Sequence, residues 1–142
     1  MNKDISDAIS IKLNEKYANC EIYTKNVRQG LEEPCFYIKA EKSSRQNLLG
    51  KRHIRMYPFD IMYFPEDEDD NEHMYEVSDE LMELLEYITL VNGDMLRASD
   101  DMGGEIIDGV LHFNVTYKVI MNDLSKEDSM DNYDSSIDLK RG

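Results

Sequence analysis

GVLHFNVTYKVIM, residues 109–121, is the stretch that decides the fold of this chain. Its apolar residues recur at every second position: Leu111, Phe113, Val115, Tyr117, Val119 and Met121. Most positions between them are polar: His112, Asn114, Thr116 and Lys118. Because successive side chains of a strand point to opposite faces, this pattern predicts one long strand with a wholly apolar face. An apolar face of that length needs a cover, which the rest of the chain has to supply.

Two segments have the spacing of amphipathic helices and would form that cover. In residues 3–17 the apolar stripe is Ile5, Ala8, Ile9 and Leu13. In residues 73–89 it is Val77, Leu81, Leu84, Leu85 and Ile88. Asn2 or Asp4 is the expected N-terminal cap of the first helix, and Asn92-Gly93 is expected to end the second. Both stripes are expected to meet the long strand.

Shorter strands are predicted at residues 20–25, 35–41 and 94–101, and a longer one at residues 53–64. In the longer strand, one face carries Tyr57, Phe59, Ile61 and Tyr63, and the other carries Ile54, Met56, Met62 and Phe64. Pro58 cannot donate a hydrogen bond to a neighbouring strand, so it predicts an edge strand or a bulge. An edge strand with two apolar faces favours a neighbouring subunit as its cover.

The predicted fold class is therefore α+β. The expected architecture is a two-layer sandwich, with a mainly antiparallel sheet and two amphipathic helices on one face, in the order α-β-β-β-α-β-β. Residues 94–101 and the long strand are predicted to form a hairpin, with a turn at residues 101–105 and with residues 105–108 leading through Gly109 into the long strand. The domain is expected to span residues 1–121. Residues 122–142 are rich in Ser, Asp and Asn and are predicted to be a flexible polar tail.

Composition restricts the possible functions. The chain has 30 acidic and 16 basic residues, a formal net charge of −14. This excess opposes binding to phosphate backbones, which depends on cationic contacts. No apolar run approaches the length of a membrane span, and residues 1–10 lack the apolar core of a signal peptide, so we expect a soluble protein of the cytoplasm.

Catalytic and metal-binding signatures are missing from the sequence, and neither a cofactor nor a metal is expected. Cys20 and Cys35 are fifteen positions apart without a Cys-x-x-Cys motif, so they are expected to be buried thiols, unless adjacent strands bring them together in a disulfide. His53, His73 and His112 are far apart, and His112 is expected to face solvent or a hydrogen-bond partner. Asp100, Asp101 and Glu105 flank Gly-Gly and are interpreted as a hydrophilic turn, with loose cation binding as the alternative.

The order of these elements resembles that of phage tail terminators encoded by prophages and phage-tail-like bacteriocins of Gram-positive bacteria. The resemblance covers about residues 1–121 and rests on these stretches: MNKDISDAISIKLNEKY, PCFYIKA, RMYPFDIMYFP, the acidic entry to the second helix, and GVLHFNVTYKVIM. It implies a homohexameric ring that caps the tail tube at its head-proximal end, stops elongation and offers a surface for head attachment. The implied partners are the tube protein, the sheath protein where the tail is contractile, and a head-tail connector, with DNA passing through the ring.

Three other interpretations stay open from the sequence. A head-tail connector or tail-completion protein of the same particle is the first alternative, since it would share the charge and the oligomeric arrangement. A monomeric acidic inhibitor that mimics DNA is a further alternative, although the apolar strand at residues 53–64 argues against it. An enzyme whose site is assembled by folding is the last. The composition alone does not distinguish these classes.

The expected contact surfaces follow from an asymmetry of charge. Residues 39–55 carry six basic side chains and one acidic one, whereas residues 66–72 carry six acidic side chains and no basic one. Contacts with another subunit or with the tail tube are expected at Arg45, Leu48, Leu49, Lys51, Arg52, Arg55, Met56 and Met62. The complementary acidic surface is expected at Glu66, Asp67, Glu68, Asp69 and Asp70. Two oppositely charged, solvated loops with no contact between them are the alternative.

Overall fold

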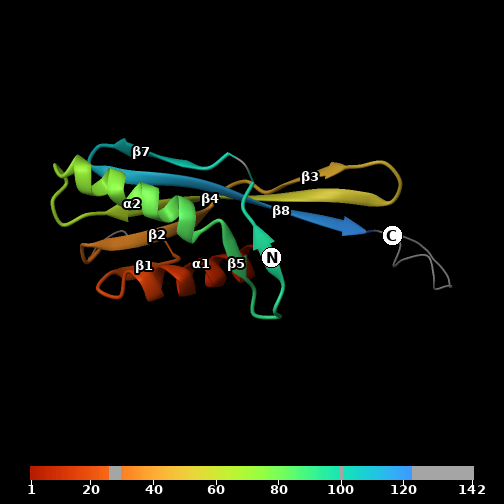
Figure 1. The fold of residues 1–142 in the computed structure, drawn as a ribbon, viewed down its shortest axis with the longest axis horizontal. Helices are drawn as coiled ribbons and strands as arrows, with labels where there is room; N and C mark the ends of the chain where they lie inside the picture. The colour runs from red at the N-terminus through yellow and green to blue at the C-terminus, as the bar shows by residue number, and fades with distance from the viewer. Residues whose placement is uncertain (26–29, 100, 123–142) are drawn as a thin grey trace. The chain divides into compact units, whose positions relative to one another are not determined.

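The computed structural model describes residues 1–25, 30–99 and 101–122 (Figure 1). The chain forms two compact units. Among the described residues, the first lies within Met1–Ser43 and Tyr57–Lys118, and the second comprises Ser44–Met56 and residues 119–122. Part of the turn predicted at residues 26–34, Asp100, and the predicted tail from residue 123 lie outside the described residues.

The helices are α1 (Asn2–Lys16) and α2 (Asn71–Leu84). The strands are β1 (Glu21–Tyr23), β2 (Cys35–Ala40), β3 (Ser44–Asn47), β4 (Arg52–Phe64), β5 (Tyr87–Thr89), β6 (Met95–Arg97), β7 (Gly103–Ile107) and β8 (Val110–Asn122). The main sheet has the order β1-β2-β4-β8-β7, and β3 pairs with the first part of β4. Strands β1 and β2 are parallel, whereas the β2–β4, β3–β4 and β7–β8 pairs are antiparallel. The α+β class and the mainly antiparallel sheet are as predicted.

The core forms on one face of the main sheet. The β4 face that carries Tyr57, Phe59, Ile61 and Tyr63 is buried, as are Leu111, Phe113, Val115 and Tyr117 of β8. Val119, also expected in the core, is only half-buried. Helix α1 contacts β1 and β2, and α2 contacts β7, so both helices cover this sheet. The ring of Tyr17, just after α1, lies 5.0 Å from that of Phe36 on β2.

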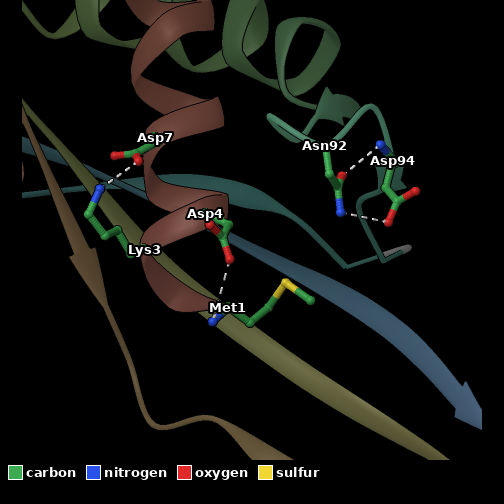
Figure 2. A network of polar contacts seen from close by, with 6 residues as sticks. All are labelled: Met1, Lys3, Asp4, Asp7, Asn92 and Asp94. Atoms are coloured by element: carbon green, nitrogen blue, oxygen red, sulfur yellow. Dashed lines mark hydrogen bonds and ion pairs between the residues drawn. The ribbon is translucent and has the colours of Figure 1, made fainter.

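Helix α1 buries the predicted stripe of Ile5, Ala8, Ile9 and Leu13. Its N-cap is Met1 and makes no side-chain capping bond, so the expectation of an Asn2 or Asp4 cap was wrong. Asp4 instead lies in the first turn, where a carboxylate favours the positive end of the helix dipole, and its Oδ2 is 3.7 Å from the terminal amine (Figure 2). A favourable charge in the first turn, and not a side-chain hydrogen bond, therefore stabilises the N-terminus of this helix.

Helix α2 begins and ends earlier than predicted. The Asp70 carboxylate caps it by accepting a hydrogen bond from the His73 backbone N–H at 3.1 Å. The helix ends at Leu84, which is only half-buried, and Tyr87–Thr89 form β5. Gly93, expected to cap the helix, instead occupies the β5–β6 turn with a φ of 96°. Ile88 is buried as predicted, but from a strand.

Strand β4 is not an edge strand, so the edge interpretation of Pro58 was wrong, but the bulge alternative fits, because three residues (41–43) oppose two (57–58) at this point. Its second part pairs with β2 from Phe59 onward and its first part pairs with β3 up to Met56. Pro58 lies between these two runs, where its missing N–H interrupts neither, and its carbonyl accepts a bond from the Glu41 N–H at 2.9 Å. Residues 42–52, predicted as an irregular hairpin tip, contain the additional strand β3.

The predicted hairpin partner of the long strand was wrong. Strand β8 pairs with β7, which lies in the expected turn and lead-in, whereas β6, within the expected partner at residues 94–101, pairs with β5, and Ala98 makes an isolated bridge to Tyr117. Ile107 and Val110 are paired, which leaves Asp108 and Gly109 as the two turn residues. Both have positive φ, 52° and 76°, as a two-residue turn that matches the twist of a β-hairpin requires. The long strand predicted at residues 109–121 is β8.

Candidate assembly surfaces

The possible metal ligands and the two cysteines are considered first. No group of His, Cys, Asp or Glu that could hold a metal ion occurs in the described part of the chain. Cys20 and Cys35 are buried free thiols, and burial raises the pKa of Cys35 to about 11. Since the thiolate is the nucleophilic form, Cys35 is unreactive at neutral pH. None of the helices described here is long and apolar enough to cross a membrane.

The three histidines are hydrogen-bonded to different partners. The Nε2 of His53 accepts from Arg55 Nε at 3.2 Å, and the Nε2 of His73 lies 2.8 Å from the Tyr63 hydroxyl. His112 Nδ1 lies 3.0 Å from Asp60 Oδ2, which confirms that it is a hydrogen-bonded imidazole on the polar face of β8. Each of the three histidines therefore makes its own, separate hydrogen bond.

The basic hairpin is the unit formed by β3, the tip at residues 48–51, and the first part of β4. Arg45 of β3 is directly opposite Arg55 of β4, and Arg45 Nε donates to Asn47 Oδ1 at 3.3 Å. A bond from the Leu48 N–H to the Arg52 carbonyl closes the tip at 2.9 Å. Lys51 and Arg52 are exposed, and Leu49 is 93% exposed at the tip. Most of the basic residues singled out from the sequence thus lie on one hairpin.

The acidic segment, residues 66–70, is exposed throughout but well supported. Asp70 caps α2, and Asp67 Oδ1 accepts a bond from the Asp69 N–H at 3.0 Å. Glu68 packs on the β7–β8 turn so closely that a Cβ added to Gly109 would lie 2.8 Å from the Cβ of Glu68. The segment is therefore an acidic surface held by local contacts, and a further acidic residue, Asp108, precedes Gly109 in the β7–β8 turn.

The face of the main sheet opposite the helices is only partly covered. On β4, Met62 and Phe64 are half-buried in the first unit, and Ile54 and Met56 are half-buried in the second. Asp60 lies on this face, and its Oδ1 is buried without a hydrogen-bond partner among the described residues. The alternation along β4 predicted this second face, but the alignment of residues between strands was not visible in the sequence.

The β5–β6 hairpin also exposes apolar side chains, which sequence reasoning missed because residues 87–89 were assigned to the second helix rather than to a strand that pairs with residues 95–97. Tyr87, Val91 and Met95 are 44%, 84% and 65% exposed. Arg97 covers the Tyr87 ring at 5.6 Å and pairs with Glu86 at 3.1 Å. An alternation over only three residues on each side of the turn is too short to distinguish a strand from a helical turn.

A scan against protein families matches residues 4–130 to the family described as "Phage tail terminator protein". The chain belongs to this family. No curated protein matches the sequence. The match covers most of the chain, includes both helices and every described strand, and extends past residue 121, where the predicted domain ends.

This membership confirms the resemblance. As a member of the tail terminator family, the protein is a structural component of a phage tail that completes the tail and interacts with other tail or head proteins. The family is structural rather than enzymatic. The charged and apolar surfaces described above are therefore candidate contacts with other proteins.

Proposed function

We propose that this tail terminator caps the head-proximal end of a phage or phage-like tail tube as a ring of identical subunits, with six subunits as the expected number. The ring stops tube elongation and presents the surface to which the head attaches. The family match over residues 4–130 carries this proposal. The tube protein and the head-tail connector are the proposed partners, together with the sheath protein where the tail is contractile.

The two charged surfaces support a contact between neighbouring subunits. The basic hairpin of one subunit would contact the acidic segment of the next, or an acidic part of the tube. Because the two surfaces differ, this contact is heterologous, and heterologous contacts close into rings when the rotation between subunits permits it. Exposed charges mainly steer association and fix the register, while Leu48, Leu49 and Met56 of the hairpin would supply apolar adhesion.

The net charge of −14 is compatible with a ring that DNA traverses. A wall of the same sign as the phosphate backbone repels the duplex, so DNA would not adhere during passage. The charge does not itself identify the ring, because acidic proteins occur in many classes.

The direct test is tube-length control. Purified tube protein is polymerised with and without this protein, and tube lengths are measured by negative-stain electron microscopy. The proposal expects tubes to stop growing when the protein is present, with a ring-shaped density at one end. Unchanged elongation at saturating concentrations would contradict the capping function. Binding to a head connector but not to tubes would favour a connector instead.

A further inference from the structure

A row of polar side chains crosses the open face of the main sheet in the first unit. Lys39 of β2 is paired with Asp60 of β4, and Glu105 of β7 is paired with His112 of β8. The 3.0 Å contact between His112 Nδ1 and Asp60 Oδ2 joins the two pairs. The row therefore reads Lys39, Asp60, His112, Glu105 across β2, β4, β8 and β7, and it alternates donor and acceptor.

An apolar row lies beside this polar row. Tyr37 of β2 is paired with Met62 of β4, and Ile107 of β7 with Val110 of β8. Both pairs are two residues from the polar row, on the same face of the sheet. Ile107 is 46% exposed, and the other three are half-buried.

Both apolar pairs lie on the same side of the polar row. Glu68, just beyond the end of β4, packs against Gly109, just before the start of β8. The end of β4 therefore lies next to the start of β8, so these strands are antiparallel. Moving from Asp60 to Met62 on β4 is thus the same direction as moving from His112 to Val110 on β8.

These two rows are complementary to themselves under one symmetry operation. A two-fold axis parallel to the strands, between β4 and β8, reverses the order of each row but keeps its position along the strands. Lys39 then faces Glu105 of a second copy, and Asp60 faces its His112. The apolar row faces the apolar row. An axis along the polar row would instead set like charges against each other.

We propose that this open sheet face docks on the same face of a second copy of the chain, as a two-fold pair with its axis parallel to the strands between β4 and β8. Contacts of this type are isologous, so every pair occurs twice. The two sheets would pack with nearly aligned strands, about 30° apart because of their twist. Lys39 is available for this contact, since its present partner, Glu41, is 3.9 Å away and both side chains are largely exposed.

The pair does not depend on the proposed ring, because it uses neither the basic hairpin nor the acidic segment. The two-fold pair is proposed for the free subunit, before that subunit binds a tail. Without the pair, the half-covered sheet face would be exposed to water. A paired face of this kind shields apolar surface that favours non-specific association.

The test is a charge swap followed by sedimentation equilibrium of the purified full chain. Lys39→Glu and Glu105→Lys should each raise the dissociation constant of the pair by about tenfold, because each creates two like-charge contacts. The double variant K39E/E105K should restore dimerisation to near the parent value, since it exchanges the two signs at the same contact. Circular dichroism checks that each variant is folded, as expected for exposed side chains.

The same measurements are made in the K51E/R52E background, where a ring built through the basic hairpin would be weakened and the two-fold pair would persist. Three results would overturn the proposal. They are a subunit that stays monomeric at about 1 mM, single reversals that leave the association unchanged, and a double variant as weak as either single one.

Discussion

The hydroxyl of Tyr117 donates a hydrogen bond of 2.7 Å to the backbone carbonyl of Leu85, the residue immediately after α2. Tyr117 lies on β8 and is fully buried. Burial raises the pKa of its phenol, which keeps the donor protonated. Since the last carbonyls of a helix lack partners within it, this bond satisfies one where the chain leaves α2 for β5.

Tyr117→Phe is therefore expected to destabilise the protein by about 1–3 kcal/mol, the cost of leaving a buried carbonyl without its donor. Thermal or urea unfolding measures the change. Tyr75→Phe is the matched control. Because Tyr75 is 57% exposed, this variant should be as stable as the parent protein. Equal stability of Y117F and the parent would show that this bond contributes nothing.

The core itself is tested by Leu81→Ala on α2 and Phe113→Ala on β8. Both side chains are fully buried, so each truncation removes apolar contacts and leaves a cavity. The expected loss is about 2–5 kcal/mol in the free energy of unfolding. Ile11→Ala provides the comparison, because Ile11 is on α1 but 55% exposed, and its loss should stay within about 0.5 kcal/mol.

Gly104 sets the distance between β7 and α2. A Cβ at this position would lie 2.4 Å from Ser78 Oγ and 3.0 Å from a Leu111 methyl carbon. Gly104→Ala should therefore destabilise the fold by about 1–3 kcal/mol through overpacking. Gly103→Ala, one residue earlier, meets nothing within 4 Å and should be tolerated. A chemical denaturation series that finds both variants alike would argue against close packing of α2 on β7.

The basic hairpin is tested by Lys51→Glu with Arg52→Glu. This double reversal should slow ring assembly and tube capping without unfolding the subunit, because both side chains are exposed. Assembly of the parent should also slow at about 1 M salt, where screening reduces the range of charge attraction to about 3 Å. The matched control is K3E/K25E, which changes the net charge equally at exposed positions. If K51E/R52E caps tubes as fast as K3E/K25E at low salt, the hairpin is ordinary solvated surface.

Cys35 predicts a loss of stability in alkali. Burial raises the pKa of its thiol from 9.0 to about 11, so between these values the unfolded chain ionises while the folded one stays protonated. The folded state then binds more protons, and stability falls as pH rises from about 9 to 11. Cys35→Ala should reduce this slope, measured as the difference between parent and variant in urea unfolding at pH 8 and pH 11. Identical slopes would exclude a contribution from this thiol.

Periodicity predicted the elements that are long enough to show it. The alternation of β8 extends over many residues and the stripe of α1 repeats three times, so their buried faces were predicted correctly. The alternation of β4 showed two apolar faces and did not decide which one is buried. The end of α2 was not predicted, because Leu85 and Ile88 fit a helical stripe as well as a strand. Only the Tyr117 bond and the β5–β6 pairing distinguish the two.

The sequence by itself determined the α+β class, the long strand β8 with its core face, the core face of α1 and the resemblance to tail terminators, because these depend on local spacing. The tertiary structure alone decided which strands are neighbours. It placed β4 inside the sheet despite Pro58, brought Asp60 beside His112 from 52 positions away, and fixed the acidic segment on Gly109. The alignment of residues between distant strands is set by packing of the whole core, so it cannot be predicted from any single segment.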